Sequence, residues 1–312
     1  RMSALVPSPR TIVDGGTRVI THLTVSCPVG PVAPAGMDVR RLAAGMDRPI
    51  GMFDSGFGGL TVARALIDVL PGEDLVYIGD TGRYPYGPKP LDEVHRYARQ
   101  LSRSLVEDFG VKAIVVACNT ATASGLDDIR SELDVPVIDV IEPGVRSLVR
   151  ATATGRVGVI GTVGTISSGA YVDAVARTGA PVHLALAACP GFVEFVERGQ
   201  VAGDEVTVLA ERLLAPVREA DVDTLLLGCT HYPFLARVIA DVMGPGVTLV
   251  SSADETAFAA TDRLGSLGLL RDATHVGQHR FLSSGDIDVF RELGERLLGP
   301  ELAATERWTP PA

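Results

Sequence analysis

Lysine, long apolar runs and paired cysteine motifs are scarce or absent in this sequence. Only two lysines, Lys89 and Lys112, occur in 312 residues, and 28 basic against 38 acidic side chains give a formal net charge of −10. A nucleic-acid-binding surface is basic, so we expect no nucleic-acid partner. No stretch reaches the roughly 18 consecutive apolar residues of a transmembrane helix, so we expect no membrane partner either.

The sequence has four cysteines, and none of them belongs to a CxxC pair. They are Cys27, Cys118, Cys189 and Cys229. This usage excludes a disulfide framework and a four-thiolate zinc site, and it predicts free thiols in a reducing, cytoplasmic compartment. His275 and His279 have the spacing of metal ligands, but no third ligand is near them and Gly277 disfavours a helix. We therefore expect no metal site.

Residues 1–46 contain scattered proline and glycine and show no helical period. Asp14, Arg18 and His22 interrupt the longest apolar stretches, so the segment lacks the apolar centre of a secretory signal. We expect a disordered N-terminal extension.

From Pro49 onward, short apolar runs alternate with helical periods, which predicts an α/β fold with mostly parallel sheets. The predicted strands are Ile50–Phe53, Leu75–Ile78, Ala113–Ala117, Val137–Val140, Val157–Ile160, Val182–Ala187, Thr224–Leu227 and Thr248–Val250. The predicted helices include Leu60–Leu70, Leu91–Phe109 and Ser168–Thr178. The expected division is a first α/β domain of residues 47–141 plus 252–300, a second α/β domain of residues 142–251, and a tail of residues 301–312.

The two halves of this pattern repeat each other approximately. When Gly51 is aligned with Gly158, Ser55 aligns with Thr162. A cysteine then lies 67 residues after the glycine in the first half and 71 residues after it in the second. Each cysteine, Cys118 and Cys229, ends a buried strand, at the sheet edge where open α/β folds bind ligands. A single free cysteine is more often a small buried hydrophobe, but two at matching strand ends favour a functional pair.

Two facing thiols suit one chemistry in particular. A thiol in the first turn of a helix is expected to have a lowered pKa, because unpaired N–H groups stabilise the thiolate. One such group on each face of a carbon could remove a proton from one side and supply one to the other, as in a two-base racemase or epimerase. Asp54 and His231 are candidate acid–base helpers for the two thiols. Without the cysteine motifs, Asp54 would be interpreted as a helix N-cap and His231 as a structural histidine.

Five segments then resemble one family, the cofactor-independent glutamate racemases of bacterial cell-wall synthesis. They are FDSGFGGLTVARAL, GDTGRYPYG, ACNTAT, VGVIGT and LGCTHYP, which begin at Phe53, Gly79, Ala117, Val157 and Leu227. The resemblance implies two pseudo-symmetric α/β domains with the active site in the cleft between them. It implies interconversion of L- and D-glutamate without a cofactor, which supplies D-glutamate for peptidoglycan.

The resemblance also assigns residues. It implies that Cys118 and Cys229 transfer protons, that Asp54 assists Cys118 and that His231 assists Cys229. Glu197 matches a further acidic residue of the family, although a glutamate on an amphipathic helix usually faces solvent. The implied substrate contacts, together with the repeat partner Thr162, are Asp54, Ser55, Tyr86, Gly87, Asn119, Thr120, Thr162, Thr230 and His231.

Three other functions compete with this one. A pyridoxal-phosphate racemase needs a Schiff-base lysine, and Lys89 and Lys112 lie in a turn and at the start of a buried strand. An aspartate racemase or related isomerase could use the same cysteine pair. A non-catalytic amino-acid-binding protein could keep the cleft, but the intact Cys229-Thr230-His231 motif argues against it. Cys27 and Cys189 are expected to be bystanders, and the expected partners are glutamate and, in a homodimer, a second copy of the chain.

Overall fold

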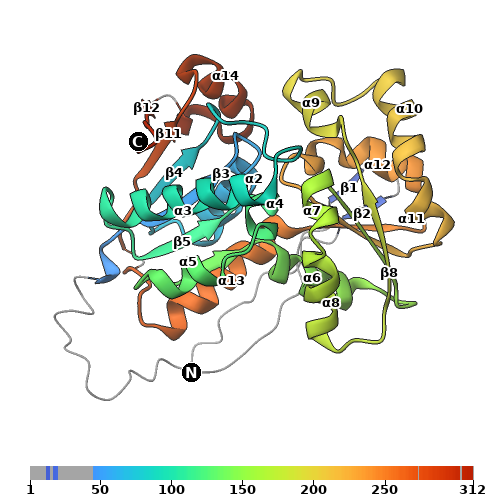
Figure 1. The fold of residues 1–312 in the computed structure, drawn as a ribbon, viewed down its shortest axis with the longest axis horizontal. Helices are drawn as coiled ribbons and strands as arrows, with labels where there is room; N and C mark the ends of the chain where they lie inside the picture. Colours follow the sequence, from blue (N-terminus) through green and yellow to red (C-terminus); the bar gives the residue numbers. More distant parts are fainter. Residues whose placement is uncertain (1–11, 15–16, 20–44, 273, 303, 312) are drawn as a thin grey trace.

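The computed structural model describes residues 12–14, 17–19, 45–272, 274–302 and 304–311. They form two α/β lobes that lie side by side (Figure 1). The first lobe contains a six-stranded sheet of order β12-β11-β4-β3-β5-β6, in which every pair is parallel. Its strands are β3 (Ile50–Asp54), β4 (Leu75–Gly79), β5 (Ala113–Val116), β6 (Val137–Asp139), β11 (His279–Ser283) and β12 (Thr305–Arg307).

The second lobe contains a six-stranded sheet of order β1-β2-β10-β9-β7-β8, parallel except for the hairpin of β1 and β2. Its strands are β1 (Ile12–Asp14), β2 (Thr17–Val19), β7 (Arg156–Gly161), β8 (His183–Ala188), β9 (Thr224–Gly228) and β10 (Thr248–Ser251). The chain passes from the first lobe to the second between β6 and β7 and returns after β10. Two lobes with parallel sheets confirm the predicted fold class.

Helices cover both faces of each sheet. In the first lobe, Met52 and Tyr77 pack toward α2, whereas the alternating Phe53 and Ile78 pack toward α3. The helices of this lobe are α2 (Leu60–Val69), α3 (Leu91–Glu107), α4 (Asn119–Ala123), α5 (Asp127–Glu132), α13 (Ser252–Ser266) and α14 (Ile287–Leu298), followed by the 3₁₀ turn η2 (Gly299–Leu302). Strands buried on both faces are typical of parallel sheets.

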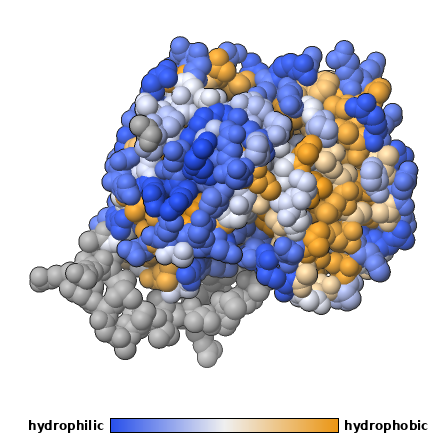
Figure 2. All heavy atoms as spheres, in the orientation of Figure 1, coloured by the Kyte–Doolittle hydropathy of each residue, from blue (hydrophilic) through white to orange (hydrophobic). Residues whose placement is uncertain are grey.

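The second lobe is layered in the same way. Its helices are α6 (Ile141–Ala151), α7 (Val163–Ser167), α8 (Ala170–Thr178), α9 (Phe192–Glu197), α10 (Asp204–Leu213), α11 (Ala215–Glu219) and α12 (Ala236–Met243), with the 3₁₀ turn η1 (Tyr232–Leu235). Helix α13 joins the lobes, because it packs against both α2 and α6. On the face drawn in Figure 2, hydrophilic side chains dominate the first lobe and apolar ones gather on the second.

The eight predicted strands are confirmed to within one residue at each end, and the three predicted helices to within two. The apolar runs identify them because most of these strands are buried on both faces. Residues 301–312 were expected to be a tail outside the α/β domains, but part of this segment belongs to the sheet of the first lobe. Residues 305–307 form the edge strand β12, and Trp308 is buried and donates from Nε1 to Ser104 Oγ at 2.9 Å.

Most of the predicted N-terminal extension, residues 1–46, lies outside the described residues. Its described residues are those of the short strands β1 and β2, with β2 beside β10, and residues 45 and 46. Within the described ranges, no helix combines the length and the apolarity needed to cross a bilayer.

Candidate active site

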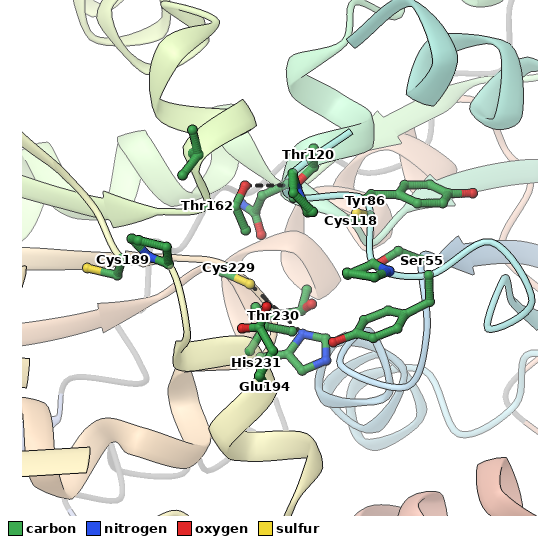
Figure 3. Close-up of a pocket in the computed structure, with 18 of the residues that line it drawn as sticks. Ser55, Tyr86, Cys118, Thr120, Thr162, Cys189, Glu194, Cys229, Thr230 and His231 are labelled. Carbon is green, nitrogen blue, oxygen red and sulfur yellow. Dashed lines mark hydrogen bonds between the residues drawn. The ribbon is translucent and has the colours of Figure 1, made fainter. Parts of the chain in front are cut away.

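A cavity of about 80 Å³ lies between the lobes, at the carboxyl ends of their strands (Figure 3). That volume holds several water-sized groups, the scale of a small molecule. The sheet registers explain how its walls meet: Gly161 pairs with Gly228, so the next residues, Thr162 and Cys229, lie side by side. Ten of the predicted site residues line the cavity: Ser55, Tyr86, Gly87, Cys118, Asn119, Thr120, Thr162, Cys229, Thr230 and His231.

The remaining two predicted residues lie one layer behind the wall. Asp54 is completely buried at the end of β3, where its carboxyl interacts with the Cys118 thiol. Glu197, at the end of α9, is partly exposed and its Oε1 lies 3.4 Å from His231 Nε2. Each of these carboxyl groups therefore stands behind a group that faces the cavity.

Around Cys118, a carboxylate and burial set the electrostatics. The Gly59 N–H donates to Asp54 Oδ2 at 2.8 Å, while Oδ1 has no hydrogen-bond partner within the described chain. Asp54 thus bonds the start of α2 without being its N-cap, which is Gly59. Burial raises the pKa of Asp54, and this outweighs the opposing effects of the nearby His231 and of the bonds from Gly59 and Ser55.

The expected lowering of the thiol pKa is wrong. Burial, followed by the charge of Asp54, raises the pKa of Cys118 to about 12. N–H groups of Ala121 and Ser55 and the Ser55 hydroxyl act in the opposite direction without compensating. The five-residue helix α4 after Cys118 is short, and desolvation in the closed cavity dominates its dipole. Cys118 is therefore a protonated thiol at neutral pH in the absence of a ligand.

Around Cys229, the helper is an imidazole. His231 Nδ1 lies 3.9 Å from Cys229 Sγ, and the ring is 2% exposed. The ring also makes an edge-on contact with Phe57, with the ring centroids 5.1 Å apart. Gly58 makes this packing feasible, because a Cβ at that position would lie 2.4 Å from His231 Nδ1. A residue of the first lobe thus shapes the Cys229 half of the site.

The two thiols influence each other. Burial raises the pKa of Cys229 well above its usual value, the N–H of His231 lowers it, and the nearby Cys118 raises it further. Because a charge on one sulfur disfavours a charge on the other, a state with two thiolates is disfavoured. The arrangement suits one thiol and one thiolate at a time.

Hydrogen bonds cross from one lobe to the other beside the cavity. The Gly164 N–H donates to Gly87 O at 3.0 Å. The hydroxyl oxygen of Thr120 lies 3.0 Å from that of Thr162 and 3.2 Å from that of Thr165. Tyr86 reaches inward from the same loop as Gly87, and its hydroxyl donates to the buried carboxylate of Asp80. These contacts fix the loop and α4 against the second lobe.

Nine further residues line the cavity and were not among the predicted site residues. Three of them, Tyr84, Cys189 and Glu194, carry a side chain that can titrate. Cys189 was expected to be a bystander, but it lines the cavity and directly follows β8. Cys229 likewise directly follows β9, and Cys118 lies two residues after the end of β5. That strand-end position was the signal that could have found Cys189. Glu194 lies one turn before Glu197 on α9, and no sequence pattern distinguishes it from other helix-surface glutamates.

Neither lysine lines the cavity. Lys112 precedes β5, at the opposite end of the strand from Cys118, where it pairs with Glu73 and donates to Met46 O at 2.7 Å. Lys89 pairs with Glu93 at 3.5 Å at the start of α3. Among the residues placed by the structure, no group of three or more His, Cys, Asp and Glu side chains has a metal-binding arrangement.

Comparisons with known proteins identify relatives over most of the chain. A model of the Asp/Glu/hydantoin racemase family matches residues 60–260. A glutamate racemase from a Parafrankia strain is 56% identical over 257 residues, which cover 82% of this chain and 92% of the relative.

Solved structures resemble the fold at similar coverage. A glutamate racemase isoform from Bacillus anthracis superimposes with a TM-score of 0.79 at 40% identity, covering 84% of this chain and 97% of its own. A glutamate racemase from Francisella tularensis, solved in complex with D-glutamate, gives a TM-score of 0.79 at 34% identity, covering 85% and 98%.

Proposed function

Because this chain belongs to the Asp/Glu/hydantoin racemase family, we propose that it interconverts L-glutamate and D-glutamate by proton transfer at the α-carbon. The observation that carries the proposal is the pair of buried thiols, Cys118 and Cys229, that follow equivalent strands and line one cavity. The high identity to glutamate racemases and the D-glutamate complex of a structural relative support glutamate as the substrate.

The proposed mechanism uses one thiolate and one thiol. The thiolate takes the proton from the α-carbon, so the C–H bond breaks and its electron pair remains on carbon. The opposite thiol then gives its proton to the other face of that carbon, which inverts the centre and leaves the second sulfur as the thiolate. The mutual effect of the two sulfurs on their pKa values disfavours a state with two thiolates, so the proposal has only one sulfur charged at a time.

The helpers supply the proton acceptor that each buried thiol needs. In the proposal, the Asp54 carboxylate accepts the proton of Cys118, and His231 accepts that of Cys229. Glu197 stabilises the resulting imidazolium from 3.4 Å. Hydroxyl, amide and backbone groups of the cavity wall hold the amino acid in this proposal. The residues that supply them are Ser55, Tyr86, Gly87, Asn119, Thr120, Thr162, Thr230 and His231.

We propose that no cofactor takes part. A pyridoxal-phosphate enzyme attaches its cofactor to a lysine, whereas neither lysine of this chain lines the cavity and each is paired with a carboxylate. The two thiols and their helpers provide the base and the acid that α-proton transfer requires.

The proposed cellular role is the supply of D-glutamate for peptidoglycan in the cytoplasm. We also propose a homodimer, supported by the distribution of exposed apolar side chains. Among the described residues, four of the six large apolar side chains that are exposed belong to the second lobe: Val163, Val172, Val201 and Val208. Exposed apolar side chains of this lobe are candidates for contact with a second copy of the chain.

Racemisation of glutamate by the purified protein tests the proposal. Without any added cofactor, the protein should bring a solution of L-glutamate to zero optical rotation, and it should do the same from D-glutamate. L-Aspartate is the matched substrate, one methylene shorter. Faster turnover of aspartate would show that aspartate, not glutamate, is the substrate. Inactivity toward both amino acids would refute the proposed racemase function.

A further inference from the structure

Tyr171 lies behind the cavity and connects the two lobes. It belongs to α8 of the second lobe and is 1% exposed. Its hydroxyl accepts a hydrogen bond of 2.9 Å from Asn119 Nδ2, which belongs to the first lobe. Asn119 lines the cavity, whereas Tyr171 does not.

The same side chain contacts the neighbours of both site cysteines. Asn119 directly follows Cys118, and Gly228 directly precedes Cys229. A Cβ at Gly228 would lie 2.9 Å from the Tyr171 hydroxyl oxygen and 2.6 Å from Ile160 O, so only glycine lets the ring approach this strand. Tyr171 is therefore held in place by the strand that carries one cysteine while it binds the helix that follows the other.

In the structure, this contact engages one end of the Asn119 amide and leaves the other end free. An amide has a donor end and an acceptor end that are nearly equal in shape, so its orientation depends on its partners. Tyr171 engages the donor end, Nδ2. The acceptor end, Oδ1, is buried and has no hydrogen-bond partner within the described part of the chain. A buried acceptor without a partner is costly, which marks it as the receiver of a donor that is absent here.

The chemistry of an amino acid identifies that donor. At neutral pH both carboxylates of a dicarboxylic amino acid can only accept hydrogen bonds, and the α-ammonium can only donate them.

We propose that Tyr171 is a positioning residue, which orients the Asn119 amide so that Oδ1 accepts a hydrogen bond from the substrate α-ammonium. This inference rests on the proposed racemase function. It predicts that the Tyr171 hydroxyl acts on the substrate only through Asn119.

A double-mutant cycle tests this route. The variants are Tyr171→Phe, Asn119→Ala and their combination, and the measurements are KM and kcat for both enantiomers. A hydrogen bond to a charged group is lost when the amide turns, so Tyr171→Phe should raise KM about ten-fold in the presence of Asn119. In the Asn119→Ala background it should change KM less than about two-fold, because no amide remains to be oriented.

Tyr77→Phe is the matched control. Tyr77 is another fully buried tyrosine, and its hydroxyl donates to the main-chain Gly56 O at 2.9 Å without touching Asn119. Whatever its effect on KM, that effect should be the same in the Asn119 and Asn119→Ala backgrounds. Equal effects of Tyr171→Phe in the two backgrounds would overturn the proposal.

Asn119→Asp provides a second test that does not depend on the folding of a Tyr171 variant. Both ends of a carboxylate are acceptors, so an oxygen faces the cavity in either orientation. KM should stay within about three-fold of the unmodified protein, whereas Asn119→Ala should raise it about ten-fold. Equal losses in these two variants would overturn the acceptor role of Oδ1. Absence of glutamate turnover in the unmodified protein would instead refute the proposed function.

Discussion

The surroundings of Cys118 and those of Cys229 differ although their backbones repeat. Beside Cys118 stands a carboxyl group that is completely buried, Asp54. Beside Cys229 stands an imidazole, His231, with the partly exposed Glu197 behind it. The strand-and-helix repeat therefore determines where the thiols lie, and the choice of acid–base helper is separate in each half.

This difference changes the electrostatics of each proton transfer. When the Cys118 proton moves to the Asp54 carboxylate, one negative charge shifts from oxygen to sulfur and no new charge appears. When the Cys229 proton moves to the His231 imidazole, a thiolate and an imidazolium form together, and Glu197 can stabilise the cation. Proton transfer at Cys118 thus depends on one buried group, Asp54, whereas proton transfer at Cys229 involves a second group, the Glu197 carboxylate, besides His231.

Removal of either thiol should have the largest effect. Cys118→Ala and Cys229→Ala each remove the base on one face, so glutamate racemisation should fall by about a thousand-fold or more in both directions. Thermal unfolding of the variants checks that the fold persists. Cys189→Ala, which removes the third thiol of the cavity wall, should cost less than about ten-fold. A comparable loss in Cys189→Ala would contradict the assignment of the two bases.

Asp54→Asn should have the next largest effect and should change the pH dependence. The amide cannot accept the Cys118 proton, so kcat/KM should fall by about several hundred-fold. The thiol must then lose its proton to solvent. Burial, the largest cause of the raised thiol pKa, remains in this variant, so the thiolate fraction, and with it the residual activity, should increase with pH between pH 7 and pH 9.

Asp139→Asn is the control for that pH profile. Asp139 also ends a strand of the first lobe and is buried, but it is satisfied by Arg130 at 2.7 Å and by the N–H groups of residues 141 and 142. This variant should lose stability and keep the pH profile of the unmodified protein. A flat profile in Asp54→Asn would show that the carboxylate is not the proton acceptor.

Glu197→Gln should have the smallest effect, because it leaves the imidazole in place. Glu197 is separated from His231 by 3.4 Å and is partly exposed, so solvent screens the pair, and kcat/KM should fall about five-fold. In a His231→Asn background, which should itself lose about a hundred-fold, the same change should add nothing. A Glu197→Gln loss as large as that of His231→Asn would make the two halves equally dependent on a carboxylate.

Local patterns and the family resemblance were sufficient to predict eight of the twelve described strands and ten of the nineteen residues that line the cavity. The strands could be found because their apolar runs are buried on both faces, and Cys118 and Cys229 could be found because polar motifs follow those runs directly. Asn119 and Thr230 could be predicted as cavity residues because each directly follows one of the two cysteines in the sequence.

Contacts between distant segments were beyond such patterns. Tyr171 binds Asn119 across 52 positions of sequence, and no local period marks it. The raised pKa of Cys118 results chiefly from burial, which the sequence of the helix that follows could not reveal. The edge strand β12 was missed because its three residues, partly or fully exposed, have no apolar run.

The hydrogen at the α-carbon reports most directly on proton transfer by two different thiols. L-Glutamate is incubated with the protein in deuterated water, and both enantiomers are separated during the first few per cent of the reaction. With two bases, the newly formed D-glutamate carries solvent deuterium at the α-carbon, while the remaining L-glutamate keeps its original hydrogen. D-Glutamate that retains the hydrogen of the substrate would contradict the account.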